Sequence, residues 1–318
     1  MAFAALGDIG MAKAALIRST CRVALAGLVS LCFCGAALSK DASDGDDEPA
    51  KAASTPNLYL DLRTYYTTVP AGSLSLGFGN SALFATLPTL ATLSALTRLP
   101  TLPTVSSPAS RSIGVDVPLT VDFNDRVSVY GGFSASASRT DLSDWSALTV
   151  NSWMVGFQAD VYQQNGGSIP TITLQSTLTR SVPDAPLPTT ALNTILEFDY
   201  ALNTDETQGL LAGVQYTRVA VNSAIVTINP DIVGYVGGYY QWDNNWKLSG
   251  RFGVQSFGGA QLLNLTPFQP FTQPLVRLDP DRMDDNDNRL FGVTAQISWM
   301  PRPSYQLTVR TPLYALRN

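Results

Sequence analysis

Charged and amide side chains recur at alternate positions in several segments of this sequence. In "WKLSGRFGVQSF" (246–257), for example, polar side chains alternate with large apolar ones. The candidates for chemistry on the polar faces of these segments are Asp61, Arg63, Asp116, Asp122, Asp160, Glu197, Asp199, Lys247, Arg251, Arg310, Gln158, Gln175, Gln215, Gln255, Gln296 and Gln306. Lining a water-filled passage, such residues would select solutes by charge and by hydrogen bonding.

The signs of these charges are unevenly distributed along the chain. Acids fall in 113–123, 149–161 and 193–202, and bases fall in 246–257 and 305–313. If these segments form opposite walls of a passage, one wall is acidic and the other basic, which suits small polar or zwitterionic solutes. The alternative is that the charges pair with one another and close the interior as a polar core.

Catalytic and metal-binding chemistry is poorly supported by composition. The sequence has no histidine, and its three cysteines, Cys21, Cys32 and Cys34, all lie near the start. A serine nucleophile would need another base, so we expect no enzyme and no cofactor. The segment 259–288 is expected to be a solvated acidic connection or, less favourably, a cation-binding loop. Its candidate ligands are Asp279, Asp281, Asp284, Asp285 and Asp287.

The alternation that presents these side chains has a period of two, which is typical of β-strands with one apolar and one polar face. Most of the segments are nine to thirteen residues long, whereas strands that cross a membrane need roughly 9 to 11. We predict strands at 58–67, 73–79, 113–123, 127–137, 149–161, 171–179, 193–202, 210–221, 232–242, 246–257, 289–299 and 305–313.

An antiparallel transmembrane β-barrel of about 12 strands explains this pattern better than a soluble sandwich does. Charged residues make up only 14% of the chain, against about 25% in soluble domains. Lysine and glutamate are nearly absent from the strands, although the outer faces of a soluble sandwich would carry them. In a barrel, lipid contacts one face of each strand and lumen water contacts the other.

Residues 1–39 read as a cleaved signal peptide, with Lys13, Arg18 and Arg22 before the apolar run 23–38. Translation could begin at Met1 or at Met11. Residues 40–57 form an acidic tail expected to be disordered, and 58–318 form the barrel. Within it, 80–112 is rich in Pro, Thr and Leu and is expected to be a loop or a plug.

The leader, the cysteine-free body and the alternating strands resemble a Gram-negative outer-membrane β-barrel protein of the small channel or porin-like class. This resemblance implies the cell outer membrane as location, lipid as partner and passive passage of small polar solutes as function. The alternative is a non-conducting structural or interaction protein. The formal net charge of −5 argues against nucleic acid as a partner, and the oligomeric state is left open.

The predicted strands also imply an orientation. With twelve strands and both ends on one side, the short turns "VPAG", "ND", "DNN" and "PRP" would lie on the other side. Bacterial barrels usually have their short turns on the periplasmic side, so this arrangement would be the reverse of the usual one.

Overall fold

The computed structural model describes residues 56–71, 109–182, 188–222, 226–262, 265–268, 270–285, 288–299 and 302–316. Within them, no helix is long and apolar enough to cross a membrane. The strands are β1 (Asn57–Val69), β2 (Ser110–Asn124), β3 (Val127–Thr140), β4 (Thr149–Tyr162), β5 (Thr171–Ser181), β6 (Thr189–Ala201), β7 (Gln208–Val221), β8 (Val226–Ile228), β9 (Asp231–Gln241), β10 (Trp246–Phe257), β11 (Ala260–Leu262), β12 (Leu265–Phe268), β13 (Phe271–Met283), β14 (Arg289–Ser298) and β15 (Ser304–Leu316).

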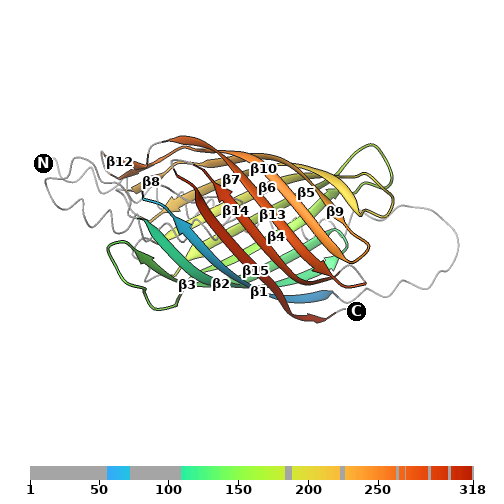
Figure 1. Cartoon of the computed structure of the whole chain (residues 1–318), viewed down its shortest axis with the longest axis horizontal. Helices are drawn as coiled ribbons and strands as arrows, with labels where there is room; N and C mark the ends of the chain where they lie inside the picture. Colours follow the sequence, from blue (N-terminus) through green and yellow to red (C-terminus); the bar gives the residue numbers. More distant parts are fainter. Residues whose placement is uncertain are drawn as a thin grey trace, which may run out of the picture. The chain divides into compact units, whose positions relative to one another are not determined.

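Twelve of these strands form one closed antiparallel barrel (Figure 1). Their order around the barrel is β1, β15, β14, β13, β10, β9, β7, β6, β5, β4, β3 and β2. The barrel closes where β1 pairs with β15, with Tyr65 opposite Thr308. Because each strand has two partners, no strand edge is left unpaired within the barrel. The predicted fold class and strand number are therefore confirmed.

The alternation in the sequence determines which side chains face outward. On β9, Val233 and Tyr235 are 0% and 7% exposed, whereas the flanking Ile232 and Val236 are 47% and 61% exposed. On β10, Phe252 and Val254 are likewise exposed, while Gln255 between Val254 and Ser256 is fully buried. Large apolar residues thus cover the outside of the barrel and polar ones lie within, the pattern of a barrel surrounded by lipid.

The two rims of the barrel differ in their connections. At the rim where β1 begins and β15 ends, called here the near rim, the connections are 125–126, 163–170, 202–207, 242–245 and 284–288. At the opposite, far rim they are 70–109, 141–148, 182–188, 222–230, 258–270 and 299–303. The far rim carries the longest connections and the small sheet of β8, β11 and β12, two strands of which are labelled at the left of Figure 1.

The predicted orientation is therefore corrected. The turns "ND" and "DNN" lie at the near rim, where β1 begins and β15 ends, and not at the opposite rim. The prediction counted a strand at 73–79 before these turns, whereas the twelve strands that close the barrel run from β1 directly to β2. Later in the chain, 271–283 was assigned to a connection although it is the barrel strand β13. This strand contains Pro274 and Pro280, neither of which can donate a backbone hydrogen bond to a neighbouring strand.

Several predictions fall on residues outside the described ranges. These are the leader 1–39, nearly all of the tail 40–57, the strand 73–79 and most of 80–112, of which 110–112 belong to β2. Both neighbours of β1 in the barrel are described, and they are β2 and β15. The leader, the tail and the alternatives of loop or plug for 80–112 remain predictions.

Tyrosine rings on the lumen side lie over glycines of the neighbouring strand. The directly opposed pairs are Tyr65 with Gly114, Tyr130 with Gly156, Tyr235 with Gly213, and Tyr239 with Gly209. A Cβ atom added to Gly213 would lie 2.5 Å from the ring of Tyr235. The missing side chain of each glycine therefore provides the space in which a lumen tyrosine lies flat against the wall.

Candidate functional site in the barrel lumen

The barrel encloses a cavity of about 810 Å³ with a mainly polar lining. Ten of its lining residues are formally charged, and these come from eight strands and one near-rim connection. They are Arg63, Asp116, Asp160, Glu197, Asp199, Glu206, Arg251, Arg277, Arg289 and Arg310. Five are bases and five are acids, so attraction for a solute depends on which charges are already paired inside the lumen.

One half of the wall carries a connected network of ion pairs. Arg251 on β10 contacts Glu197 on β6 at 3.1 Å and Asp279 on β13 at 3.4 Å. The first contact spans three inter-strand steps, each about 4.8 Å wide, so it reaches across part of the lumen. The Tyr235 hydroxyl donates to Glu197 at 2.7 Å and holds the same carboxylate from β9.

The network continues through two buried aspartates on β13. Asp279 also accepts from Arg277 at 2.8 Å and from the Thr294 hydroxyl at 2.5 Å. Asp281 lies 2.8 Å from Arg310 and 3.3 Å from Arg289. Each aspartate thus contacts two or more cations, which compensates for its removal from bulk water.

The facing part of the wall is polar but contains few cations. Tyr130 on β3 shares a 2.6 Å hydrogen bond with Thr177 and accepts one of 2.9 Å from Gln175. Asp160 on β4 accepts from the Thr173 hydroxyl at 2.8 Å and from Gln163 at 3.3 Å. Among the described residues, neither Asp160 nor Asp199 has a cation within ion-pair distance.

The structure brings twelve of the sixteen predicted pore-lining residues to the edge of this cavity. They are Arg63, Asp116, Asp160, Glu197, Asp199, Arg251, Arg310, Gln158, Gln175, Gln215, Gln296 and Gln306. Asp122 lines a smaller hollow of about 420 Å³ near the near rim, which it shares with Asp160. Their role toward a solute remains a prediction.

The other three lie elsewhere on the inner wall. Asp61 is 3.6 Å from Arg63 in a partly exposed ion pair. The Lys247 ammonium lies 4.5 Å from the centre of the Tyr239 ring. Gln255 donates to Asp231 at 2.9 Å and accepts from Gln273 at 2.7 Å.

The predicted acidic connection 259–288 needs a correction. Asp279 and Asp281 lie on β13 and are 3% and 6% exposed, paired with arginines and not solvated. Asp284 accepts from Asn288, and Asp285 accepts from Asn245. Asp287 lies outside the described residues, and no group of three potential metal-ligating side chains occurs within those ranges.

Sequence reasoning missed Arg277 and Arg289, and it also missed that the basic wall contains carboxylates. The signal was present in "TQPLVRLDPDR", where Gln273, Leu275, Arg277, Asp279 and Asp281 occupy alternate positions. Because Asp279 and Asp281 lie among the arginines, that wall is mixed in charge and not purely basic.

Inward side chains nearer the far rim are tightly buried. Val233, Gln255 and Leu275 are 0% exposed, and Gln215 and Gln273 are 1% exposed. Val233, Tyr235 and Leu275 form an apolar cluster against which Ile195 packs. The polar cavity is therefore bounded toward the far rim by an inner layer of amides and apolar side chains.

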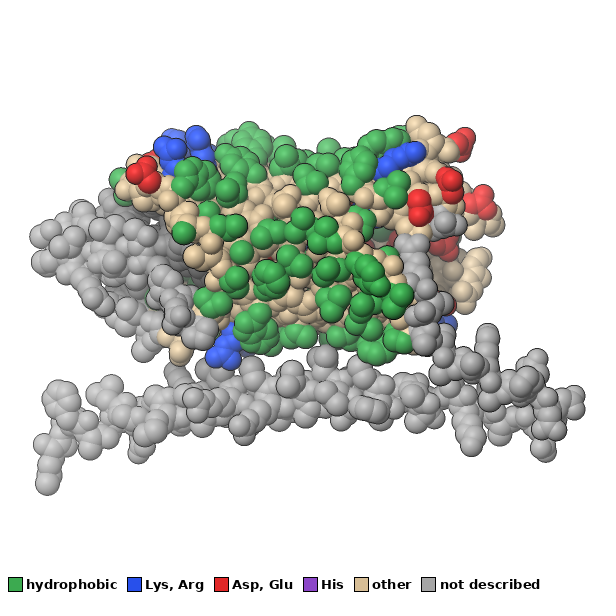
Figure 2. Space-filling view, turned by 90° about the horizontal axis from the view of Figure 1, so that it is seen from below, with side chains coloured by type: hydrophobic (Ala, Val, Ile, Leu, Met, Phe, Trp, Pro, Cys, Tyr) green, Lys and Arg blue, Asp and Glu red, His purple; other side chains and the backbone are tan. Residues whose placement is uncertain are grey.

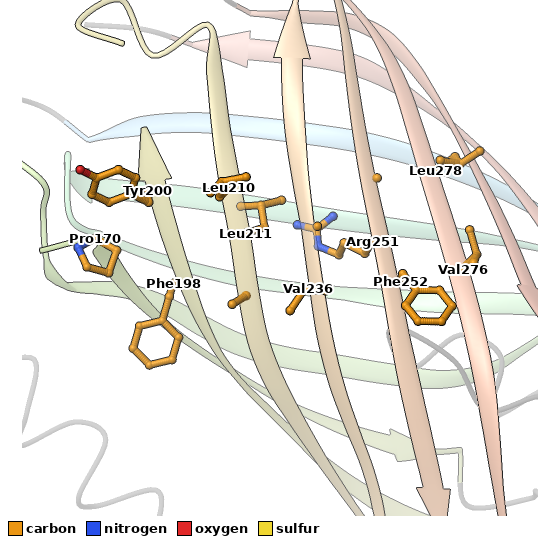
Figure 3. Close-up of a pocket in the computed structure, with 13 residues that line it drawn as sticks. Pro170, Phe198, Tyr200, Leu210, Leu211, Val236, Arg251, Phe252, Val276 and Leu278 are labelled. Atoms are coloured by element: carbon orange, nitrogen blue, oxygen red, sulfur yellow. The ribbon is translucent and has the colours of Figure 1, made fainter. Parts of the chain in front are cut away.

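A second hollow, of about 800 Å³, lies on the outside of the barrel and has an apolar lining. Phe198, Ala212, Val236, Phe252 and Val276 stand opposite one another on five successive strands. Figure 3 shows four of these side chains around the groove. The small side chain of Ala212 leaves room between Phe198 and Val236. The lining of this groove is suited to apolar groups and not to polar solutes.

Solved structures similar to this chain include three bacterial proteins. An outer-membrane channel from Pseudomonas putida F1 is 11% identical, with a TM-score of 0.48 over 86% of this chain and 100% of that one. The translocator domain of the autotransporter NalP from Neisseria meningitidis is 13% identical, with a TM-score of 0.40 over 92% and 97%.

The transport unit of the autotransporter AIDA-I from Escherichia coli is 8% identical, with a TM-score of 0.45 over 86% and 93%. No family model and no curated protein matches the sequence. At such low sequence identities, these structural similarities concern the fold alone. The fold of this chain is established by its own strand pairing.

Proposed function

We propose that this chain is an outer-membrane channel that lets small polar solutes pass through a charged lumen. The observation that carries the proposal is the cavity of about 810 Å³ inside a closed barrel, lined by charged and amide side chains. A water-filled interior of this kind would bring a solute into contact with fixed charges and hydrogen-bonding groups. The proposal includes no catalysis, because the sequence has no histidine to act as a general base.

The distribution of ion pairs gives the proposed channel a preference for cations. Arg251, Arg277, Arg289 and Arg310 each lie within 4 Å of a carboxylate, so their charges are largely compensated. Within the described residues, Asp160 and Asp199 face the same cavity without such a partner. In a water-filled passage with low-dielectric walls, uncompensated carboxylates raise the local concentration of cations.

Planar-bilayer recording of the refolded chain tests both the proposed conduction and the proposed preference for cations. We expect discrete conductance steps and a cation-to-anion permeability ratio above one. Asp160→Asn together with Asp199→Asn should lower this ratio, whereas Asp141→Asn, in a far-rim connection, should leave it nearly unchanged. A ratio that the double variant does not alter would contradict the assignment of the cation preference to these two residues.

Two observations favour the second candidate, a barrel that does not conduct. The ion pair between Arg251 and Glu197 crosses part of the lumen, and the inward side chains toward the far rim are almost fully buried. Such a layer could close the interior as a polar core. If folded protein inserts into bilayers but produces no conductance steps, this structural or interaction role replaces the channel.

A further inference from the structure

A row of polar and charged side chains crosses the outer face of four strands near the far rim. Along this row, Tyr305 on β15 stands opposite Thr68 on β1, Thr68 opposite Arg111 on β2, and Arg111 opposite Arg139 on β3. Tyr305 is 51% exposed, and both arginines are exposed as well. Thr67 and Ser112, which flank this row on their strands, are buried, so the row faces away from the lumen.

The two arginines are directly opposed across a strand pair. Side chains in this relation have Cβ atoms about 5 Å apart, and like charges there destabilise a sheet. In the described part of the chain, no carboxylate lies within ion-pair distance of either one. The acids of the adjacent connection, Asp141 and Asp144, are also exposed and unpaired there. An anion between the two guanidinium groups would remove this repulsion.

The level of the row points to a lipid as the source of that anion. The next outward positions toward the middle of the barrel are Tyr66, Ile113 and Leu307, which are 39%, 45% and 47% exposed. These side chains belong to the apolar belt, so Arg111 and Arg139 stand at its border. In a membrane, this border is occupied by lipid headgroups, with acyl chains against the apolar side chains below.

Single outward arginines opposite exposed apolar side chains occur at both rims. Arg180 on β5 stands opposite Trp153 and Arg218 on β7 opposite Leu192 at the far rim, and Arg282 on β13 stands opposite Trp246 at the near rim. Among the described strands, two outward arginines stand directly opposite each other at Arg111 and Arg139. The near-rim connections instead carry the exposed acids Asp125, Asp205, Glu206, Asp243 and Asp285. Figure 2 shows most acidic side chains at its right-hand end, where basic side chains also occur, and basic side chains at its left-hand end.

We propose that Arg111 and Arg139, with Thr68 and Tyr305 beside them, bind the phosphate monoester headgroup of a lipid in the leaflet at the far rim. Two guanidinium forks offer paired N–H donors that match phosphate oxygens. The hydroxyl groups of Thr68 and Tyr305 extend the same row of donors. This site is independent of whether the lumen conducts.

Unfolding in neutral detergent, with and without lipid, tests the proposal on the full chain. Phosphatidic acid, a phosphate monoester lipid, should raise the unfolding midpoint of the wild type, because a ligand that binds only the folded state stabilises it. Phosphatidylcholine, which has no net charge, and inorganic phosphate at equal concentration should have little effect. Equal stabilisation by inorganic phosphate would contradict a lipid site.

The variant Arg111→Gln with Arg139→Gln should lose the response to phosphatidic acid, with apparent affinity at least about tenfold weaker. Without lipid, it should be as stable as the wild type or more stable, because the repulsion is gone. Arg282→Gln, at the near-rim end of β13, is the matched control and should respond like the wild type. The single variant Arg139→Gln provides a second test if the double variant does not fold. An undiminished response in the arginine variants would overturn the proposal.

Discussion

At the scale of single residues, Arg251 is the central cation of the lumen network. Its guanidinium donates to both oxygens of Glu197, at 3.1 and 3.3 Å, and to Asp279 at 3.4 Å. Lys247 lies four residues closer to the near rim on the same strand. Its ammonium instead faces the Tyr239 ring and has no ion pair among the described residues. The same formal charge therefore has two different structural roles on one strand.

This difference leads to a prediction for Arg251→Gln compared with Lys247→Gln. The first change leaves Glu197 and Asp279 with fewer partners, so it should lower the free energy of unfolding by about 2 kcal/mol, the order of a hydrogen bond between charged groups. It should also increase cation selectivity more than the second change does. Urea unfolding and bilayer recording measure the two effects, and identical behaviour of the two variants would contradict the assigned network.

At the scale of elements, contacts between neighbouring strands depend on the pairing of lumen tyrosines with glycines. Tyr235 lies over Gly213 and at the same time donates to Glu197. The glycine on β7 thus determines how closely the ring approaches the wall and where the hydroxyl reaches. The packing of β7 against β9 is in this way linked to the position of a charged group in the lumen.

We therefore expect Gly213→Ala to destabilise the barrel by about 1–3 kcal/mol, the usual cost of overpacking. Its Cβ would lie 2.5 Å from the Tyr235 ring and 2.9 Å from the backbone oxygen of Leu196. Gly234→Ala, on the outer face of β9, is the matched control, because a Cβ there meets no atom within 4 Å. Unfolding midpoints of the two variants in the same detergent would show whether the close approach of the Tyr235 ring to Gly213 contributes to stability. Equal midpoints would contradict this role.

At the scale of the whole barrel, the two rims differ in connection length and in charge. The near rim has the short connections and most of the exposed acids, while the far rim carries most of the outward arginines and the small sheet. Bacterial barrels usually place short turns in the periplasm and long connections outside the cell. We therefore expect the far rim to face the exterior.

Labelling of introduced cysteines on intact cells tests this orientation. Every cysteine of the chain lies at or before position 34, within the predicted leader, so a new one would be unique after cleavage. Ser146→Cys, at the far rim, should react with a membrane-impermeant maleimide. Asn244→Cys, at the near rim, should react only after lysis. The opposite result would reverse the orientation, and mobility that changes on boiling would verify that both variants are folded.

Much of this architecture follows from the sequence alone, because the period of two is a local property of each strand. It correctly assigned Phe252 and Val254 to the outer face and Arg251 and Gln255 to the inner face. It also predicted a closed antiparallel barrel of about 12 strands. It failed at β13, because the density of aspartates led to the assignment of 259–288 as an acidic connection although 273–281 alternate regularly.

Only the tertiary structure decided which inner side chains meet. Arg251 and Glu197 are 54 positions apart in the chain and three strands apart around the barrel. Alternation specifies the face of a residue but not its height in the barrel, which depends on the register of every intervening strand pair. For this reason the ion-pair network, the difference between the rims and the opposed arginines Arg111 and Arg139 appear only when the barrel is closed.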